Sequence, residues 1–222
     1  MKSLTVVFAD LAGFTAATDI HGDETAADLS ARLVSCAREA LGTGDRLVKS
    51  IGDAVMCAST EPEAAVVMVR RLLDAASAEP GFPELRVGLH HGPVVERDLD
   101  LFGGTVNIAA RVANHARSGQ VLATTEVADA ASLLDVGVTR LGHFVLRNLS
   151  EAVELCELDL GCRSCGIAID PVCQMRVERD RAPGRLRHGG VEWWFCSLEC
   201  AARFAAAPLS YIADRVPDPI DE

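Results

Sequence analysis

The order of apolar and polar positions predicts strands and helices that alternate through the first part of the chain. Residues 4–10 form an apolar run that ends at Asp10, which predicts a buried strand. Apolar residues then recur at helical spacing, at Leu29, Leu33, Val34 and Ala37. A hairpin is expected next, because Gly52-Asp53 is a favoured two-residue turn. The two strands of this hairpin are 46–51 and 54–59.

The same alternation continues to about residue 160. Residues 61–78 predict a second helix, because Pro62 stands where the first helical turn tolerates proline. Further elements are expected as a strand pair, 85–91 and 93–97, around Gly92, a helix at 106–116, a strand at 121–125 and strand-like stretches at 136–140 and 144–158. Two β-α-β passes around one sheet predict an α+β, ferredoxin-like (βαββαβ) core with additions.

Composition and charge narrow the class of protein. The chain has 222 residues, 49% of them hydrophobic, which is typical of a globular protein. A formal net charge of −11, with no cluster of lysines and arginines, argues against non-specific nucleic-acid binding. The apolar start is too short for a signal peptide, and no stretch approaches the roughly 18 apolar residues of a membrane span. We therefore expect a soluble, cytoplasmic protein that binds neither nucleic acid nor membrane.

The composition changes at about Gly161, where a cysteine-rich segment begins. We place a first domain at 1–160, a linker at 161–168, a small second domain at 169–214 and a tail at 215–222. Cysteines crowd this part of the chain, at Cys162, Cys165, Cys173, Cys196 and Cys200, with Cys156 just before. In a reducing cytosol, such crowding indicates metal ligation or redox chemistry before structural disulfides. The second domain is too short for a hydrophobic core alone, so a bound metal would help to hold it together.

Six polar residues in the first domain stand out: Asp10, Lys49, Asp53, Asp100, Asn107 and Arg111. Each alone has an ordinary structural explanation, such as a helix cap, a turn former or an exposed stripe on a helix. Five of them lie in three motifs, at 8–15, 49–54 and 102–111, and Asp100 lies just before the third motif. Together and in this order, the motifs resemble those of the class III nucleotidyl cyclase domain. The resemblance covers roughly residues 4–158.

The resemblance implies an adenylate cyclase, which converts ATP to 3′,5′-cyclic AMP and pyrophosphate. Attack of the ribose 3′-hydroxyl on the α-phosphorus needs an activated hydroxyl and neutralised phosphate charge, which two divalent ions supply together. Asp10 and Asp53 are the expected ligands of two such ions in each active site, since carboxylates suit Mg²⁺ or Mn²⁺. The turn that follows Asp10 offers backbone N–H groups to the phosphates, at Gly13, Phe14 and Thr15.

Base choice and transition-state stabilisation involve the other four residues. Asp100 is an acceptor and Lys49 a donor, which matches the amino group and ring nitrogen of adenine. Guanine reverses both, and guanylate-specific members of the family carry a different pair here. Asn107 and Arg111, one helical turn apart, are the expected catalytic residues. In the family the asparagine positions the ribose, and the arginine stabilises charge on the transferring phosphate.

The resemblance also implies a homodimer with its active sites at the subunit interface. Both metal carboxylates come from one subunit in this family, and the remaining four residues come from the other. Lys49 and Asp53 of one chain would then serve opposite sites. Two alternatives stay open. In the first, the cyclase domain binds nucleotide with weak or no turnover. In the second, metal handling by the second domain is the main role of the protein.

The cysteine-rich segment resembles a YHS domain, a small metal-associated module, over about residues 168–213. The resemblance rests on the stretches 170–175 and 190–200. Thiolate-rich sites favour Zn²⁺ or Cu⁺, and the sequence does not choose between them. A purely structural metal and a sensor of metal or thiol state that biases the cyclase dimer both remain open.

The expected ligands of this domain are its cysteines. Cys196 and Cys200 are four residues apart and can converge on one ion, with Cys173 as a third ligand. Cys162 and Cys165 have the spacing of a ligand pair and can complete the set.

The remaining histidines and cysteines carry weaker signals. His90 and His91 alternate on a predicted strand and point to opposite faces, so we expect structural roles for both. Cys36 and Cys57 are expected in the core. No signal is readable at three other histidines: His21, His115 and His143.

Overall fold

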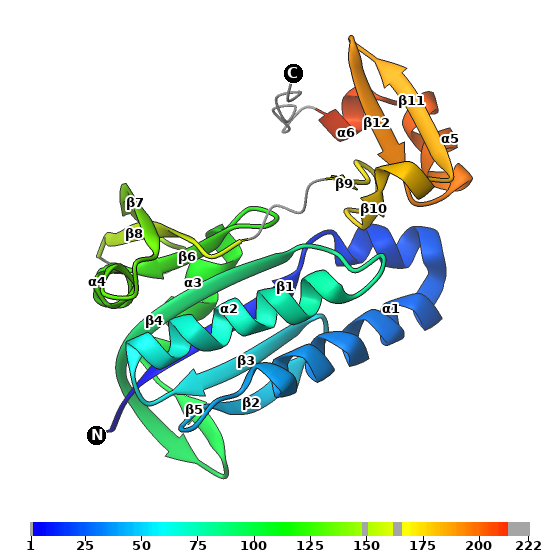
Figure 1. Ribbon diagram of the computed structural model, residues 1–222. Coiled ribbons are helices and arrows are strands. Elements are labelled where there is room, and N and C mark those ends of the chain that lie inside the picture. The colour runs from blue at the N-terminus through cyan, green and yellow to red at the C-terminus, as the bar shows by residue number, and fades with distance from the viewer. Residues whose placement is uncertain (1, 148–150, 162–165, 213–222) are drawn as a thin grey trace. The chain divides into compact units, whose positions relative to one another are not determined.

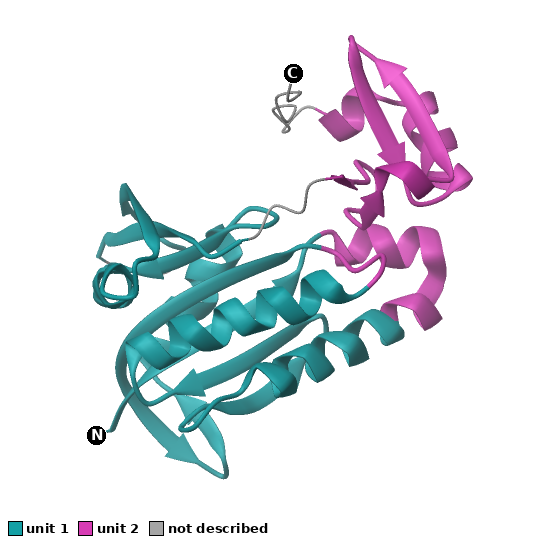
Figure 2. Cartoon of the chain, in the orientation of Figure 1, with its two compact units in different colours: residues 1–12, 27–79, 84–162 teal, residues 13–26, 80–83, 163–222 magenta. Residues whose placement is uncertain are grey.

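The computed structural model describes residues 2–147, 151–161 and 166–212. The chain divides into two compact units, which Figure 2 colours separately. Unit 1 consists of residues 1–12, 27–79 and 84–162, and unit 2 of residues 13–26, 80–83 and 163–222. Unit 2 therefore combines the cysteine-rich segment with two short pieces of the first 160 residues. Cys162, Cys165 and the tail expected at 215–222 lie outside the described residues.

Unit 1 is built on a sheet of eight strands (Figure 1). The strands are β1 (Lys2–Leu11), β2 (Arg46–Ile51), β3 (Ala54–Ser59), β4 (Leu85–Arg97), β5 (Asp100–Phe102), β6 (Val121–Thr124), β7 (Gly137–Phe144) and β8 (Val153–Asp159). The helices are α2 (Pro62–Ala78), α3 (Gly104–His115), α4 (Thr125–Ser132) and the second part of α1 (Phe14–Ala40). No helix within the described ranges has the length and apolar character that a membrane span needs.

The strand order of this sheet is β2-β3-β1-β4-β6-β8-β7, with β5 paired to β4. β1 pairs antiparallel with both β3 and β4. Helix α1 connects β1 to β2 across β3, and α2 connects β3 to β4 across β1. This is the ferredoxin-like βαββαβ arrangement, so the predicted α+β fold class is confirmed. β6 extends the sheet by pairing parallel to β4.

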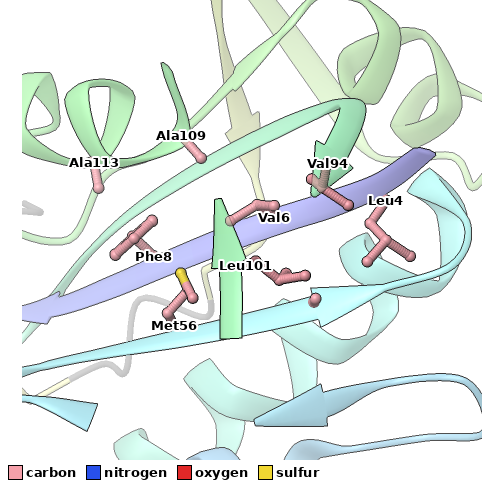
Figure 3. Close-up of a cluster of buried hydrophobic side chains, with 9 residues drawn as sticks. Leu4, Val6, Phe8, Met56, Val94, Leu101, Ala109 and Ala113 are labelled. Carbon is pink, nitrogen blue, oxygen red and sulfur yellow. The ribbon is translucent and has the colours of Figure 1, made fainter. Parts of the chain in front are cut away.

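Strand β1 is buried almost from end to end, which explains why its sequence is a continuous apolar run. One face packs against α3 in a buried cluster, shown in Figure 3, of Leu4, Val6, Phe8, Met56, Ala58, Val94, Leu101, Ala109 and Ala113. Helix α3 lies so close to β4 that a Cβ on Gly88 would collide with the backbone of Ala113. Helix α2 packs on β1 and β3 with residues buried at helical spacing: Ala65, Val66, Met68, Val69, Leu72 and Ala76. The end of β1 is thereby fixed by packing on both sides.

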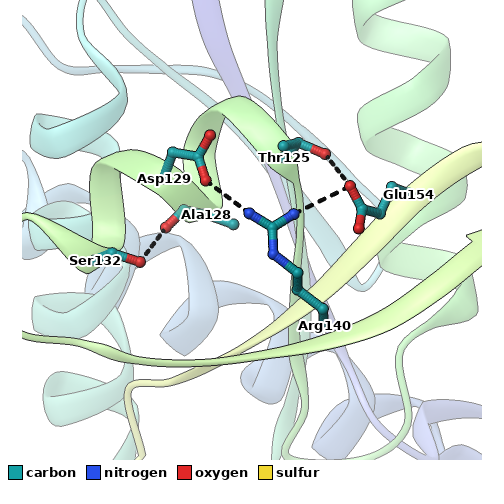
Figure 4. Close-up of polar contacts among 6 residues, drawn as sticks. All are labelled: Thr125, Ala128, Asp129, Ser132, Arg140 and Glu154. Carbon is teal, nitrogen blue, oxygen red and sulfur yellow. Dashed lines mark hydrogen bonds and ion pairs between the residues drawn. The ribbon is translucent and has the colours of Figure 1, made fainter.

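A polar network at the edge of unit 1 joins α4 to two strands (Figure 4). The Arg140 guanidinium on β7 donates to Asp129 of α4 and to Glu154 of β8, each at 3.1 Å. Thr125 Oγ1 donates to the same Glu154 carboxylate at 3.0 Å. The hydrogen bonds from Thr125 and Arg140 lower the pKa of Glu154. Because the Arg140 side chain is 53% exposed, the network orients α4 more than it stabilises the fold.

The structure corrects three expectations for unit 1. The strand pair expected around Gly92 is one continuous strand, β4, because Gly92 stays in register with Leu4 of β1. A Cβ there would lie 2.7 Å from Thr105 Oγ1, so the glycine allows a close approach and makes no turn. Residues 144–158 are not one strand, since β7 ends at Phe144 and β8 begins at Val153. Strand β5 and helix α4 have no counterpart among the predicted elements, because both are short and directly adjoin other elements.

The C-terminal part of unit 2 contains two strand pairs, β9 with β10 and β11 with β12. Its elements are β9 (Ile167–Ile169), β10 (Arg176–Glu178), the 3₁₀-helix η1 (Arg179–Arg181), β11 (Gly184–His188), β12 (Val191–Phe195), α5 (Leu198–Ala206) and α6 (Leu209–Ile212). Phe204 of α5 is buried at the centre of this part, with ring centroids of Trp193, Phe195 and Tyr211 at 5.5, 5.2 and 6.2 Å. The hydrophobic core of this small domain is therefore mainly aromatic.

Candidate active site and metal centre

Two carboxylates lie where β1 ends. Asp10 is the last residue but one of β1, and Asp53 lies in the tight turn between β2 and β3. Gly52 has a φ of 60° in this turn, a left-handed conformation that favours glycine. The Leu11 N–H donates to the Asp53 carbonyl at 3.1 Å, which fixes the turn against the end of β1. The backbone thus brings the two expected metal carboxylates together.

Burial and a neighbouring arginine set the charge state of Asp10. Its side chain is only 15% exposed, and its Oδ2 forms an ion pair with Arg86 Nη2 from the neighbouring strand β4. Burial raises the pKa of Asp10 to about 6, against the opposing effect of Arg86 and with a further contribution from Asp53. Asp10 Oδ1 is buried and has no hydrogen-bond partner among the described residues. A divalent cation between the two carboxylates would satisfy this oxygen, so these residues fit such an ion.

Lys49 and Asp100 form an ion pair elsewhere in unit 1. Lys49 Nζ, on β2, lies 2.6 Å from Asp100 Oδ2, at the start of β5. The hydrogen bond from Lys49 is the main cause that lowers the pKa of Asp100. The Asp100 carboxylate therefore stays ionised at neutral pH, and the pair presents a donor beside an acceptor.

Asn107 and Arg111 lie on the same side of α3 and line a cavity of about 630 Å³. The Arg111 guanidinium donates to the Asn107 main-chain carbonyl at 3.1 Å, one helical turn away. Ala109 and Ala113 of the same helix face the buried cluster, so the core fixes which side of α3 lines the cavity.

Asp10 and Asp100 lie near opposite ends of β4. Asp10 is opposite Arg86, close to the start of this strand, whereas Asp100 is opposite Arg97, its last residue. Figure 1 shows β4 as a long curved strand between these two regions of unit 1. No hydrogen bond or ion pair within the described ranges joins the two metal carboxylates to the Lys49–Asp100 pair.

The expected phosphate turn belongs to unit 2 and opens helix α1. Gly13 has a φ of 70°, and its carbonyl accepts a hydrogen bond from the Ala17 N–H at 2.9 Å. Phe14 and Thr15 follow as the first two helical residues. A Cβ on Gly13 would collide with the Gln174 side chain, so this turn packs directly against the cysteine-rich segment.

Three cysteines and one histidine converge in unit 2. Cys196 Sγ lies 3.4 Å from Cys173 Sγ, 3.7 Å from Cys200 Sγ and 3.4 Å from His21 Nε2. All four potential ligand atoms lie within 4.8 Å of one another. A disulfide bond needs an S–S distance of about 2.05 Å, so the three cysteines are free thiols. Three of the five predicted thiol ligands are therefore brought together, and His21 lies beside them.

The pKa values of the clustered thiols shift in different directions. Hydrogen bonds from Cys173 first and from Cys196 second lower the pKa of Cys200. The pKa of Cys173 is raised, mainly by its hydrogen bond with Cys196. Cys200 also lies in the first turn of α5, where the helix N-terminus favours a thiolate.

Asp170 and Ser197 arrange the backbone around these thiols. Asp170 is fully buried, and its two carboxylate oxygens accept hydrogen bonds from the Val172 and Cys196 N–H groups, each at 2.8 Å. Ser197 caps α5 by accepting a hydrogen bond from the Cys200 N–H at 3.1 Å. Cys196 accordingly precedes the helix, while Cys200 lies within it.

Three residues of these sites do not stand out in the sequence: His21, Arg86 and Asp170. His21 lies 175 residues before Cys196, and only the fold brings the two side chains together. In the sequence, Arg86 is an ordinary charged residue near the start of a predicted strand. Only the β1–β4 register shows that it lies opposite Asp10. The Asp170-Pro171 dipeptide is a signal for a turn, which hints at a backbone role for this aspartate.

His90 and His91 have structural roles, as predicted. His90 Nδ1 lies 2.8 Å from Thr124 Oγ1, and His91 Nδ1 lies 2.9 Å from Thr5 Oγ1. Burial lowers the pKa of His90 to about 4, so this side chain is neutral at physiological pH. The two cysteines expected in the core are indeed buried: Cys36 and Cys57.

Comparison with known proteins identifies both parts of the chain. The family model described as the adenylate and guanylate cyclase catalytic domain matches residues 1–154, and the YHS domain model matches residues 168–215. A pH-sensitive adenylate cyclase of Mycobacterium tuberculosis (strain CDC 1551 / Oshkosh) is 37% identical over 129 residues, which cover 58% of this chain and 32% of that protein. The chain spans about a third of the length of the curated cyclases that it matches.

Two further similarities concern the cysteine-rich segment and the fold. A copper-transporting P-type ATPase of Rhizobium leguminosarum bv. viciae is 44% identical over 46 residues, 21% of this chain and 6% of that protein. The structure of an adenylate cyclase from Trypanosoma brucei in its monomeric state has a TM-score of 0.62 at 25% identity, covering 72% of this chain and 90% of that chain. The chain belongs to the family of adenylate and guanylate cyclase catalytic domains, and a YHS domain follows its catalytic domain.

Proposed function

We propose that this protein is an adenylate cyclase, which converts ATP to cyclic AMP and pyrophosphate at sites shared between two copies of the chain. The observation that carries the proposal is the placement of Asp10 beside Asp53, with a buried carboxylate oxygen left free for a cation. Membership of the cyclase family and relatives named adenylate cyclase support it.

Asp10 and Asp53 would hold two Mg²⁺ or Mn²⁺ ions, since these hard cations prefer carboxylate oxygens. When bound, the ions neutralise polyphosphate charge and help to ionise the ribose 3′-hydroxyl. Before the ions bind, Arg86 is the cationic partner of Asp10 and provides the counter-charge that its buried carboxylate needs. Backbone N–H groups of the turn at 13–15 bind the phosphates.

Lys49 and Asp100 select adenine. Asp100 accepts a hydrogen bond from the adenine amino group, and Lys49 donates one to the adjacent ring nitrogen. Their 2.6 Å ion pair keeps donor and acceptor in place and leaves neither charge unpaired before the base binds. Guanine would meet a donor with a donor and an acceptor with an acceptor.

Asn107 and Arg111 act on the ribose and on the transferring phosphate. The Arg111 guanidinium is always protonated and can direct two hydrogen bonds at one phosphate group. Charge that develops on the phosphate during attack is therefore stabilised from the wall of the α3 cavity.

A complete site needs a second copy of the chain. Asp10 lies near the start of β4 and Asp100 near its end, which supports their placement in different active sites. Apolar side chains near Asp100 support an interface there: Val95, Leu99 and Phe102 are 40%, 81% and 50% exposed. An isologous contact between two such surfaces gives a homodimer with two equivalent sites.

The YHS domain serves as a sensor of metal or thiol state that biases cyclic AMP output. The convergence of its three thiols supports metal binding by Zn²⁺ or Cu⁺. Metal handling as the main role is the second candidate, favoured by the similarity of this segment to a copper-transporting ATPase. Loss of bound metal in Cys196→Ser and Cys200→Ser, without any change in cyclic AMP output, would favour the second candidate.

The direct test of the function is identification of the product. Purified protein is incubated with ATP or GTP and with Mg²⁺ or Mn²⁺, and the cyclic nucleotide is identified by mass spectrometry. Cyclic AMP should form, with a preference for ATP of at least about 100-fold, because guanine leaves Lys49 and Asp100 wrongly paired. Cyclic GMP as the main product would overturn the base assignment, and binding of ATP without product would favour a nucleotide-binding role.

Mixing inactive variants tests whether each site is shared. Asp53→Ala and Lys49→Ala should each be inactive alone, because the first removes a metal ligand and the second a base contact. In an equimolar mixture, about half of the dimers are heterodimers with one intact site, so activity should recover to about a quarter of the wild-type value.

The matched control for this experiment mixes Asp53→Ala with Asp10→Ala. Both variants lack the metal half of the site, so no combination of subunits contains an intact site and no activity should return. If the mixture of Asp53→Ala and Lys49→Ala also stays inactive after subunit exchange, the shared-site arrangement is wrong.

Asp10 should make the metal dependence of the cyclase sensitive to pH. Its raised pKa of about 6 means that a proton competes with the cation below that pH, whereas the carboxylate is free of the proton above it. The Mn²⁺ concentration for half-maximal activity should rise about tenfold per pH unit below about pH 6 and stay constant above it. Activity titrations with Mn²⁺ from about pH 5 to 7.5 measure this shift.

Arg86→Gln provides the comparison, because Arg86 lowers the pKa of Asp10. The variant should move the pH-sensitive window upward. A metal requirement that does not change over this pH range in the wild type, or a window that moves downward in Arg86→Gln, would contradict the assignment of Asp10.

A further inference from the structure

The four potential ligand atoms in unit 2 have the spacing of a tetrahedral metal site. With Zn–S bonds of about 2.3 Å and Zn–N bonds of about 2.0 Å, neighbouring ligand atoms lie about 3.5–3.8 Å apart. The distances from Cys196 Sγ to Cys173, Cys200 and His21 are 3.4, 3.7 and 3.4 Å. Three thiolates and one imidazole form a closed ligand set that is typical of structural zinc.

His21 is presented to the thiols by a break in helix α1. Gly22 follows it with a φ of 84° and a ψ of 169°, which interrupts the helix. No atom lies within 4 Å of a Cβ at Gly22, so the glycine serves the backbone conformation and not packing. Thr25 Oγ1 donates a hydrogen bond to the His21 carbonyl at 3.0 Å, which gives a partner to a carbonyl at the helix break. Residues 14–21 thus form a two-turn helix that ends at a potential ligand.

The other end of this short helix also meets the cysteine-rich segment. Gly13 packs so closely against Gln174 that a Cβ would collide with its side chain, and it lies near the Cys173 carbonyl oxygen, 3.1 Å from that Cβ position. This contact does not involve the thiols, and it is independent of the approach of His21 to Cys196. The helix 14–21 is therefore held at both of its ends within unit 2.

The surroundings of the cluster suit an ion. The buried Asp170 carboxylate accepts hydrogen bonds from the backbone of Cys196 and Val172, which fixes the ligand-bearing chain from outside the cluster. A cavity of about 230 Å³ reaches Cys196 and is also lined by Glu178 and Arg181, which provides a route of entry.

We propose that His21 is the fourth ligand of a zinc site with Cys173, Cys196 and Cys200, and that the bound ion fixes the helix 14–21 to the YHS domain. The ligand from the first part of the chain gives the metal a mechanical link to the turn at 13–15. Gly13 is three residues after Asp10, a chain distance of at most about 11 Å. Zinc occupancy therefore orders the phosphate turn, a consequence that rests on the proposed cyclase function.

The ligand assignment is tested on the full chain by nuclear magnetic resonance. The protein is labelled with ¹⁵N-histidine and loaded with ¹¹³Cd²⁺, which replaces Zn²⁺ at thiolate sites. A one-bond coupling between ¹¹³Cd and a histidine nitrogen is expected, present in His143→Ala and absent in His21→Ala. His143 is an exposed histidine on β7 and is the matched control. No coupling in the wild type, or coupling that persists in His21→Ala, would overturn the assignment.

Zinc affinity gives a second measurement that separates His21 from the other candidates. Competition with a chromophoric chelator should show that His21→Ala binds Zn²⁺ at least about 100-fold more weakly than the wild type. Loss of a residue that only hydrogen-bonds to a ligand costs up to about 100-fold in metal affinity, so loss of a ligand should cost at least as much. His143→Ala and the double variant Cys162→Ser/Cys165→Ser should bind as the wild type does. Loss of zinc in the double variant, with normal affinity in His21→Ala, would show that those cysteines complete the set and that the proposal is wrong.

Hydrogen–deuterium exchange tests the mechanical link. Zinc should slow amide exchange of residues 14–21 in the wild type and in His143→Ala, but not in His21→Ala. Equal exchange with and without zinc in the wild type would overturn the ordering of this helix. None of the three measurements requires nucleotide turnover, so an inactive cyclase would refute the proposed function and leave the zinc site standing.

Discussion

Two carboxylates held side by side at the buried end of a central strand are the constraint on which the rest of unit 1 depends. Burial raises the pKa of Asp10 to about 6, so an ionised pair at this place needs positive charge close by. Arg86 provides that charge, and it reaches Asp10 only because β1 pairs with β4 on one side, while pairing with β3 on the other brings Asp53. A strand paired on both edges and covered on both faces must be apolar, which accounts for the uninterrupted run before Asp10.

The same sheet bears on the proposal that each chain carries halves of two different sites. β4 extends from the residue opposite Asp10 to the residue opposite Asp100, so these two residues lie near its two ends. The charges of Lys49 and Asp100 neutralise each other in their ion pair. Exposed apolar side chains beside this pair, at Leu99 and Phe102, indicate a surface that a second copy covers. In this account, dimerisation is part of the catalytic site and not an addition to it.

The sequence predicts most of what depends on local pattern, and fails where contacts between distant segments decide. The hairpin at Asp53 and the start of α2 follow from turn chemistry and periodicity. The grouping of the three motifs follows from the resemblance to the cyclase family. Gly92 reads as a turn, because nothing near it in the sequence reveals that Thr105 packs against β4. His21 carries no signal, since its meaning comes from a cysteine 175 residues away. A histidine in a helix can be recognised as a potential metal ligand only when the fold shows that thiols lie beside it.

The proposed shared site requires two chains for catalysis. The most direct measurement is cyclic AMP formation per chain as a function of protein concentration, with ATP and Mn²⁺ saturating, combined with sedimentation velocity under the same conditions. Activity per chain should rise with concentration and reach half of its maximum where half of the chains are dimeric. Activity per chain that stays constant down to concentrations at which the protein is monomeric would contradict the shared site.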